Sequence, residues 1–333
     1  MPLTAAIDRN LALEAVRVTE SAALAAWQMM GRGDERAADQ AAVEAMRDAL
    51  GALAISGTVR IGEGVEGAAE KLYVGEKIGA GAGPKVDVAL KPIEGASIIA
   101  RGGYNALSVM AMAEEGGLPQ IPDIYMDKIA VGAGLPEGIV DLDKEPAENL
   151  KALAKAMGVA VPDLVVCILD RPRHAQLIAK VRETGARVRL ILDGDVSGAI
   201  AVARPESGVD VYMGIGGAPQ GVLAAAALAG LGGQIQGRLV YRSDADRATA
   251  AAVGITAFDR KYALADMAGG NVTFAATGIT DGPLLQGIER EGRGIVSHSL
   301  VIRSKTGTLR FVEAHHVVDK NPPKAAKSRR KEK

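Results

Sequence analysis

The sequence has few aromatic residues and a single cysteine. One Trp, six Tyr and three Phe stand among 333 residues, too few for the stacking surface that single-stranded nucleic acids need. The formal net charge is -1, so no whole-molecule field attracts the chain to DNA or lipid. We therefore do not expect nucleic acid as a partner. Cys167 cannot form an internal disulfide and lies in an apolar run at 164–169, which predicts a buried, inert thiol.

Long hydrophobic runs are also absent. The most apolar segment, at 222–231, is followed by two glycines and has about half the length that a transmembrane helix requires. The first residues lack the basic segment followed by an apolar one that marks a secretory signal. These observations predict a cytoplasmic protein with no membrane partner.

The charge is unevenly distributed along the chain. Between residues 319 and 333, seven Lys or Arg accompany two acids and almost no apolar side chains, which predicts a disordered basic tail. A tether for nucleic acid or for an acidic partner is the alternative to a solvated extension. Overall, 48% hydrophobic and 24% charged residues suffice for a packed core, and the length favours about two domains.

Apolar periodicity and turn residues predict an α/β fold in two halves. Residues 1–150 are expected to form an α+β half with a mixed sheet, from helices at 10–30 and 37–53 and strands at 57–61, 86–90 and 129–131. In residues 151–318 strands alternate with helices, which is typical of parallel βαβ units, so we expect a mostly parallel sheet there. Its elements are helix 147–157, strand 164–169, helix 174–184, strand 188–192, helix 198–203, strand 209–213 and helix 222–231.

Three loops of the second half follow predicted parallel strands. The glycine-rich segment 214–221 offers backbone N–H groups to an anion, or is only a tight turn. Arg171 and Arg173, separated by Pro172, suit phosphate oxygens, or they begin a surface helix. Asp193, Gly194 and Asp195 either bind sugar hydroxyls or a cation, or they form only a solvated turn. Because carboxyl ends of parallel strands meet at one edge, these loops are expected to share a site.

Two further observations concern titratable residues. Asp39, Glu63 and Glu94 lie in or beside turn-like segments of the first half; carboxylates on separate loops are how divalent cations are held for phosphoryl chemistry. His174 lies beside the arginine pair, where it either contacts the ligand or caps the following helix.

Eight segments stand in order along the chain: RVTESAALA at 17–25, GRGD at 31–34, IGEG at 61–64, LYVGE at 72–76, RPRH at 171–174, DGD at 193–195, GIGGAP at 214–219 and ATGIT at 276–280. Together they resemble the class II fructose-1,6-bisphosphatases of bacteria, within the lithium-sensitive sugar and inositol phosphatase superfamily. The resemblance covers about residues 8 to 318. It implies a layered α/β/α/β/α fold, a Mg or Mn site, and water attack on the 1-phosphate of fructose-1,6-bisphosphate in gluconeogenesis.

The resemblance also assigns roles to individual positions. It implies metal ligands at Asp39, Glu63 and Glu94, with Glu94 also catalytic, and a homo-oligomer, either a dimer or a tetramer. The positions that it implies for substrate binding are Glu94, Gly95, Ala96, Tyr125, Arg171, Pro172, Arg173, Asp193, Gly194, Asp195 and Gly217.

Five positions depart from the family pattern. Lys91 and Gln220 stand where the family has metal-binding acids, Ala96 replaces the hydroxyl that orients the attacking water, Gly67 replaces an Asp, and Glu35 replaces a Lys. These changes predict at most one bound ion and lost or reduced hydrolysis. A catalytically silent sugar-phosphate-binding or regulatory subunit of an active paralogue is the alternative. The charge changes from positive to negative at position 35 and from negative to positive at position 91, which suggests the hypothesis that Glu35 pairs with Lys91.

Overall fold

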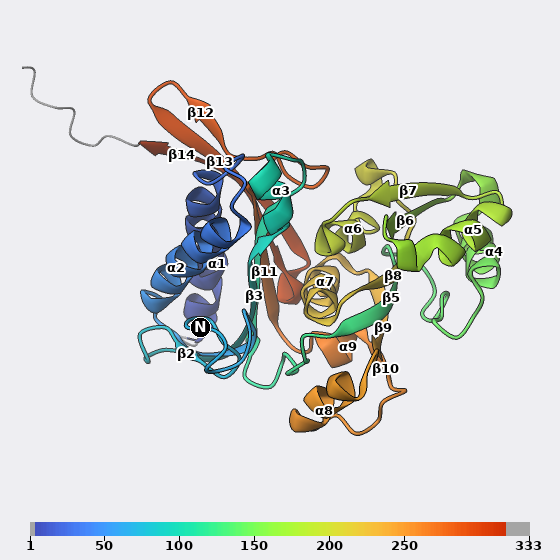
Figure 1. The fold of residues 1–333 in the computed structure, drawn as a ribbon, viewed down its shortest axis with the longest axis horizontal. Helices are drawn as coiled ribbons and strands as arrows, with labels where there is room; N and C mark the ends of the chain where they lie inside the picture. The colour runs from blue at the N-terminus through green and yellow to red at the C-terminus, as the bar shows by residue number, and fades with distance from the viewer. Residues whose placement is uncertain (1–3, 318–333) are drawn as a thin grey trace, which may run out of the picture.

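The computed structural model describes residues 4–317, with side chains from Leu11 onward. Two β-sheets alternate with three layers of helices (Figure 1). This arrangement confirms the expected α/β sandwich. The basic tail expected at 319–333 lies outside the described residues. Within them, no helix has both the length and the apolar character needed to cross a bilayer.

The first sheet takes strands from both ends of the chain. Its order is β12-β13-β11-β4-β3-β1-β2, and β14 pairs with β13. The β1–β3 pairing is parallel and the others are antiparallel, so the sheet is mixed as expected. The strands are β1 (Ser56–Ile61), β2 (Lys77–Ile78), β3 (Lys85–Glu94), β4 (Leu107–Glu114), β11 (Val272–Gly278), β12 (Glu289–Glu291), β13 (Gly294–Arg303) and β14 (Thr308–Val317).

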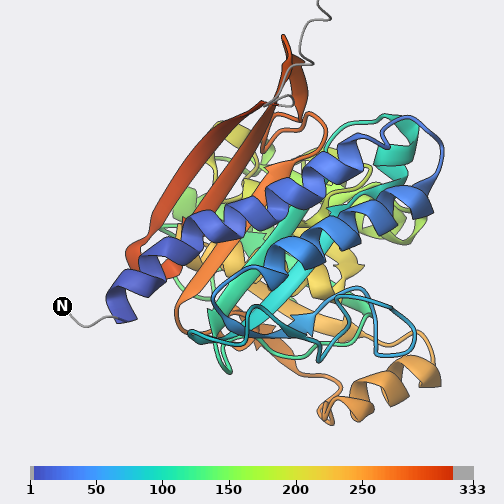
Figure 2. The same ribbon diagram turned by 90° about the vertical axis from the view of Figure 1, so that its left-hand side faces the viewer.

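Helices α1 (Thr4–Trp27) and α2 (Glu35–Gly51) cover the outer face of the first sheet (Figure 2). Helix α2 begins after Asp34, whose carboxylate accepts a hydrogen bond from the Ala37 N–H at 2.9 Å, as an N-cap residue does. Its buried residues recur every four positions from Ala38 to Leu50, so that one stripe faces the core.

The second sheet has the order β10-β9-β5-β8-β6-β7. We expected it to be mostly parallel, and that was wrong: β6 pairs in parallel with β7 and β8, whereas β5–β8, β5–β9 and β9–β10 are antiparallel. Strand β5 enters from the first half and runs against both neighbours. The strands are β5 (Tyr125–Val131), β6 (Val165–Leu169), β7 (Arg187–Ile191), β8 (Val211–Gly217), β9 (Gln234–Val240) and β10 (Lys261–Ala263).

The chain does not change sheets near residue 150. Strand β5 already belongs to the second sheet, and β11 to β14 return to the first. Periodicity finds strands but carries no information on which distant strand they pair with, so the two sheets could not be divided correctly along the sequence.

The remaining helices lie on either face of the second sheet or at its margins. Helices α4 and α5 pack on the outer face, and α6 and α7 lie between the two sheets (Figure 1). The bounds are α3 (Ala96–Arg101), α4 (Pro146–Met157), α5 (Ala175–Glu183), α6 (Asp195–Ala201), α7 (Ala218–Leu231), α8 (Asp244–Ala252) and α9 (Leu264–Met267), with short 3-10 helices η1 (Val161–Asp163), η2 (Pro172–His174), η3 (Pro205–Ser207) and η4 (Ser304–Thr306).

Helix α7 accounts for the most apolar segment of the sequence. A helix that is hydrophobic on all sides must be buried, and residues 222–228 are all buried between the sheets. Small side chains permit this close packing: a Cβ at Gly230 would approach Ile302 Cγ2 to 2.3 Å. Cys167 is buried in the same core, and burial raises the pKa of its thiol to about 12, which confirms the expected buried thiol.

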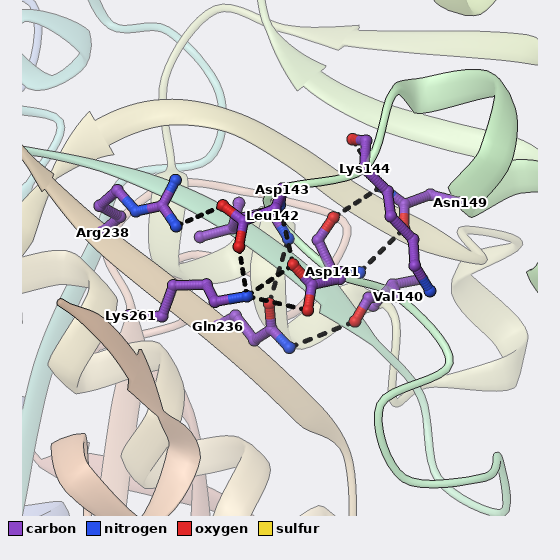
Figure 3. Close-up of polar contacts among 9 residues, drawn as sticks. All are labelled: Val140, Asp141, Leu142, Asp143, Lys144, Asn149, Gln236, Arg238 and Lys261. Atoms are coloured by element: carbon purple, nitrogen blue, oxygen red, sulfur yellow. Dashed lines mark hydrogen bonds and ion pairs between the residues drawn. The ribbon is translucent and has the colours of Figure 1, made fainter. Parts of the chain in front are cut away.

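A polar cluster attaches the segment between β5 and α4 to the second sheet (Figure 3). The Lys261 ammonium contacts both oxygens of Asp141, at 2.8 and 2.9 Å, and Oδ2 of Asp143 at 2.6 Å. Arg238 contacts the other oxygen of Asp143 at 2.5 Å. Asn149 completes the cluster by donating to the Asp141 carbonyl and accepting from its N–H. The cluster therefore fixes the start of α4 against β9 and β10.

We expect this cluster to weaken in acid. Hydrogen bonds from Lys261 hold the pKa values of Asp141 and Asp143 below 3.8, so their contribution to stability is complete above the unfolded pKa and is lost as pH falls through the folded values. Lys261→Met should therefore lower the urea midpoint at pH 7 but by a smaller amount at pH 3. An equal loss at both pH values would contradict this assignment.

Candidate functional site

The three predicted loops meet at one edge of the second sheet. Because β6, β7 and β8 are parallel, their carboxyl ends share this edge, as expected; that the three segments form one binding site stays a prediction. Antiparallel β5 begins there, with Tyr125 opposite Gly217. The arginine pair, Asp193 to Asp195, Gly217 and Tyr125 are therefore brought together by the sheet topology.

An aromatic ring and two guanidinium groups form the outer part of this edge. The guanidinium carbon of Arg173 lies 4.8 Å from the centroid of the Tyr125 ring, and that of Arg242 lies 4.4 Å from it. Arg173 also donates from Nε to the Ile215 carbonyl at 2.9 Å. Arg171 lies beside Asp193, with 4.0 Å between Nη2 and Oδ2. These cations could bind a phosphate group.

Arg242 was missed in the sequence. The signal that could have revealed it is the alternation of buried and half-buried residues through β9, which ends two residues before Arg242. Because β9 pairs with β5, Tyr125 lies opposite Val240, and this register carries Arg242 to the same edge.

The glycine-rich segment is not a loop. Residues Gly214 to Gly217 complete β8, and α7 begins at Ala218 with Pro219 in its first turn, where proline is favoured. The glycines make room for side chains: a Cβ would lie 1.9 Å from Asp195 Oδ2 at Gly216 and 1.9 Å from Gln220 Oε1 at Gly217. They serve packing in a strand, so the sequence interpretation as a loop was wrong.

His174 joins β6 to β8 and does not face the ligand edge. Its Nδ1 lies 2.7 Å from the Leu169 carbonyl, and its Nε2 accepts the Ile215 N–H at 2.8 Å. This pairing requires the neutral ring with the proton on Nδ1. A Cβ at Gly214 would approach Nε2 to 2.9 Å. Burial lowers the pKa of His174, as the geometry demands.

A buried ion pair stabilises the inner part of the edge. The Lys128 ammonium contacts Asp195 Oδ2 at 2.6 Å and the Gly217 carbonyl at 2.8 Å, and only 1% of the Lys128 side chain is exposed. The Tyr212 hydroxyl donates to the other oxygen of Asp195. Both carboxylate oxygens of Asp195 are thus partnered within the protein, and Lys128 and Tyr212 are residues that sequence reasoning did not find.

Glu94 connects the first sheet to helix α6. It ends β3, and its Oε1 accepts the Val196 N–H of α6 at 2.8 Å. Its Oε2 is buried without a partner among the described residues. Burial raises the pKa of Glu94 to about 8, and the nearby carboxylates of Asp195 and Asp193 add to the effect. Gly95 follows in the left-handed conformation, with φ of +98°, and Ala96 starts α3 without a side-chain oxygen.

Lys91 pairs with Glu63, and the hypothesis of a Glu35–Lys91 pair is wrong. The ammonium lies 3.0 Å from each oxygen of Glu63. Together with Glu63, the carboxylates of Asp39 and Asp123 raise the pKa of Lys91, so the lysine is charged at neutral pH. Glu35 lies exposed in the first turn of α2.

The residues implied as metal ligands do not fit a bound ion. No group of three or more His, Cys, Asp or Glu side chains in residues 4–317 is arranged to hold a metal. Lys91 covers both oxygens of Glu63. Exposed Gly67, with φ of +86°, supplies no ligand, and the Gln220 side chain lies against Gly217. A cationic side chain now balances the carboxylates.

Comparisons with known proteins place the chain in a family. It matches the model for bacterial fructose-1,6-bisphosphatase, glpX-encoded, over residues 9–316. It is 45% identical over 329 residues to fructose-1,6-bisphosphatase 1 class 2 of Escherichia coli K12, covering 95% of this chain and 97% of that protein. The class 2 enzymes of Escherichia coli O6:H1 and Shigella flexneri match equally well. The chain belongs to the class II fructose-1,6-bisphosphatase family.

Removing the buried ammonium should destabilise the protein strongly. Lys128→Met leaves the Asp195 carboxylate buried without its cation, which costs about 3–5 kcal/mol in the free energy of unfolding. Lys180→Met is the matched control, because Lys180 pairs with Glu145 on the surface at 2.8 Å and such pairs contribute about 0–1 kcal/mol. Urea unfolding of both variants measures the difference, and similar losses would contradict the assigned role of Lys128.

Protonation of His174 should also destabilise the fold. Its folded pKa lies below the ordinary 6.5, so the unfolded chain binds more protons in this range. The stability contributed by the neutral ring is complete above pH 6.5 and falls as pH drops through the folded pKa. Urea unfolding of His174→Asn should vary less than wild type between pH 7 and 5. Equal changes in the urea midpoints of His174→Asn and wild type between pH 7 and 5 would refute the role assigned to the neutral ring.

Proposed function

We propose that the chain binds a sugar bisphosphate, fructose-1,6-bisphosphate by family, at the edge of the second sheet. Arg171, Arg173 and Tyr125 would bind one phosphate, with Asp193 and the backbone at Gly194 and Gly217 beside the sugar. Asp195 would act through Lys128, since both of its carboxylate oxygens are already engaged. Glu94, Gly95 and Ala96 would line the other end of the ligand. The guanidinium groups of Arg173 and Arg242 at the Tyr125 ring support this assignment.

We propose further that metal-dependent hydrolysis is lost or much reduced. The observation that carries this proposal is the contact of Lys91 with both oxygens of Glu63. A divalent ion about 4 Å from the ammonium would be repelled by several kcal/mol, at an effective dielectric constant near 20. Mg or Mn would therefore bind as at most one ion, and only if Lys91 moved away from Glu63.

The contact of Lys91 with Glu63 also favours a second candidate function. A family member that binds the sugar phosphate without hydrolysing it could serve as a regulatory subunit of an active paralogue. We expect a homo-oligomer, either a dimer or a tetramer. Light scattering of the purified chain, alone and after coexpression with an active paralogue, distinguishes self-assembly from mixed assembly.

The function is tested by measuring binding and turnover separately. Isothermal titration of the wild-type chain with fructose-1,6-bisphosphate in EDTA should show binding without metal. Release of phosphate with Mn²⁺ should remain at background. Rapid Mn²⁺-dependent turnover would overturn the proposed loss of hydrolysis, and absence of binding in EDTA would overturn metal-free recognition.

Removing the Lys91 ammonium from the carboxylates of Glu63, Asp39 and Asp123 should allow a metal ion to bind. The variant Lys91→Asp, Ala96→Thr, Gln220→Glu removes the ammonium and adds oxygen ligands, and we expect Mn²⁺ to raise its melting temperature by several degrees. Gly67 is kept, because a side chain is disfavoured at its φ of +86°. Lys85→Asp is the control for charge reversal on β3, since Lys85 pairs with Glu115 at the surface. Equal responses of both variants to Mn²⁺ would show that Lys91 does not exclude the ion.

A further inference from the structure

Arg242 is the one cation at the Tyr125 ring to which the family resemblance gives no role. We propose that it binds the phosphate monoester at the end of the ligand remote from Glu94, together with Arg173. This inference rests on the proposed sugar bisphosphate ligand and deepens it, because it identifies which residues distinguish a bisphosphate from a monophosphate.

The convergence of two arginines supports this role. Arg173 comes from the segment after β6 and Arg242 from the segment after β9, yet both guanidinium carbons lie against one ring, at 4.8 and 4.4 Å from its centroid. Like charges repel, and the Tyr125 ring is only half-buried, so its cation–π contacts return little free energy. A dianion at the edge of the ring, within reach of both guanidinium groups, would offset that repulsion.

The local charge balance leaves both groups available. Within residues 4–317, Arg173 forms no carboxylate ion pair, and its Nε is used by the Ile215 carbonyl. Arg242 has one acidic partner, Asp246, which accepts from its Nε at 3.2 Å and from its backbone N–H at 2.8 Å. This contact orients the guanidinium and leaves both of its terminal nitrogens free to donate to phosphate oxygens.

The position of Arg242 is fixed by the sheet. Strand β9 places Val240 opposite Tyr125, and Ser243 caps α8 directly after Arg242 by accepting the Asp246 N–H at 3.2 Å. Arg242 therefore stands between a strand and a helix start and is held on both sides. Glu94, by contrast, lies at the end of β3 in the other sheet, so the two ends of a bisphosphate would meet different residues.

The test compares three ligands and four proteins by isothermal titration in EDTA. The ligands are fructose-1,6-bisphosphate, fructose-1-phosphate and fructose-6-phosphate, and the proteins are wild type, Arg242→Gln, Arg242→Lys and Arg247→Gln. Arg247 is the matched control, because it lies over the Tyr241 and Phe258 rings at 5.2 and 5.3 Å. Melting temperatures verify that each variant is folded.

We expect Arg242→Gln to weaken the bisphosphate and one of the two monophosphates at least tenfold, and the other monophosphate less than twofold. Arg242→Lys should lie between wild type and Arg242→Gln, and Arg247→Gln should match wild type. Equal weakening of both monophosphates, or no weakening, would overturn the role of Arg242. If wild type binds none of the three sugars, the proposed function itself fails.

Discussion

The buried ion pair between Lys128 and Asp195 joins the three elements that form the candidate site. Lys128 comes from β5, Asp195 begins α6, and the Gly217 carbonyl ends β8. Removing one partner from such a pair leaves an unpaired charge in a medium that solvates it poorly, so the three elements are constrained to move together. The outer cations at Tyr125 are presented on this fixed base, and Glu94 attaches the base to the first sheet through Val196.

A lysine side chain supplies the positive charge among the carboxylates of the first half. Glu63 is half-buried and Glu94 is buried, and Glu63 pairs with the ammonium of Lys91. An ammonium is a monovalent point charge that cannot be released into solution, whereas an ion can exchange. The relatives at 45% identity are described as fructose-1,6-bisphosphatases.

Local patterns predicted the individual elements well and the long-range pairing poorly. The spacing of apolar residues identified α2, β6, α5 and β7 within a few residues, because these elements bury one face or are buried entirely. It could not show that β5 runs against β8, nor that Lys91 selects Glu63 over Glu35. Both outcomes depend on contacts between residues far apart in the chain. Lys128 acquires its role only after folding, which explains why composition and spacing did not distinguish it from surface residues. His174 was noticed beside the arginine pair, but its contacts with the Leu169 carbonyl and the Ile215 N–H depend on folding as well.

The glycines of β8 limit how this edge can diversify. Side chains at Gly214, Gly216 and Gly217 would overlap His174, Asp195 and Gln220, so no single substitution there can reshape the site without displacing a neighbour. We expect variation in ligand preference to arise instead in the connections after β6 and β9, which carry Arg171 and Arg242. We therefore expect the glycines of β8 to tolerate little change, whereas the surrounding connections can vary and alter specificity.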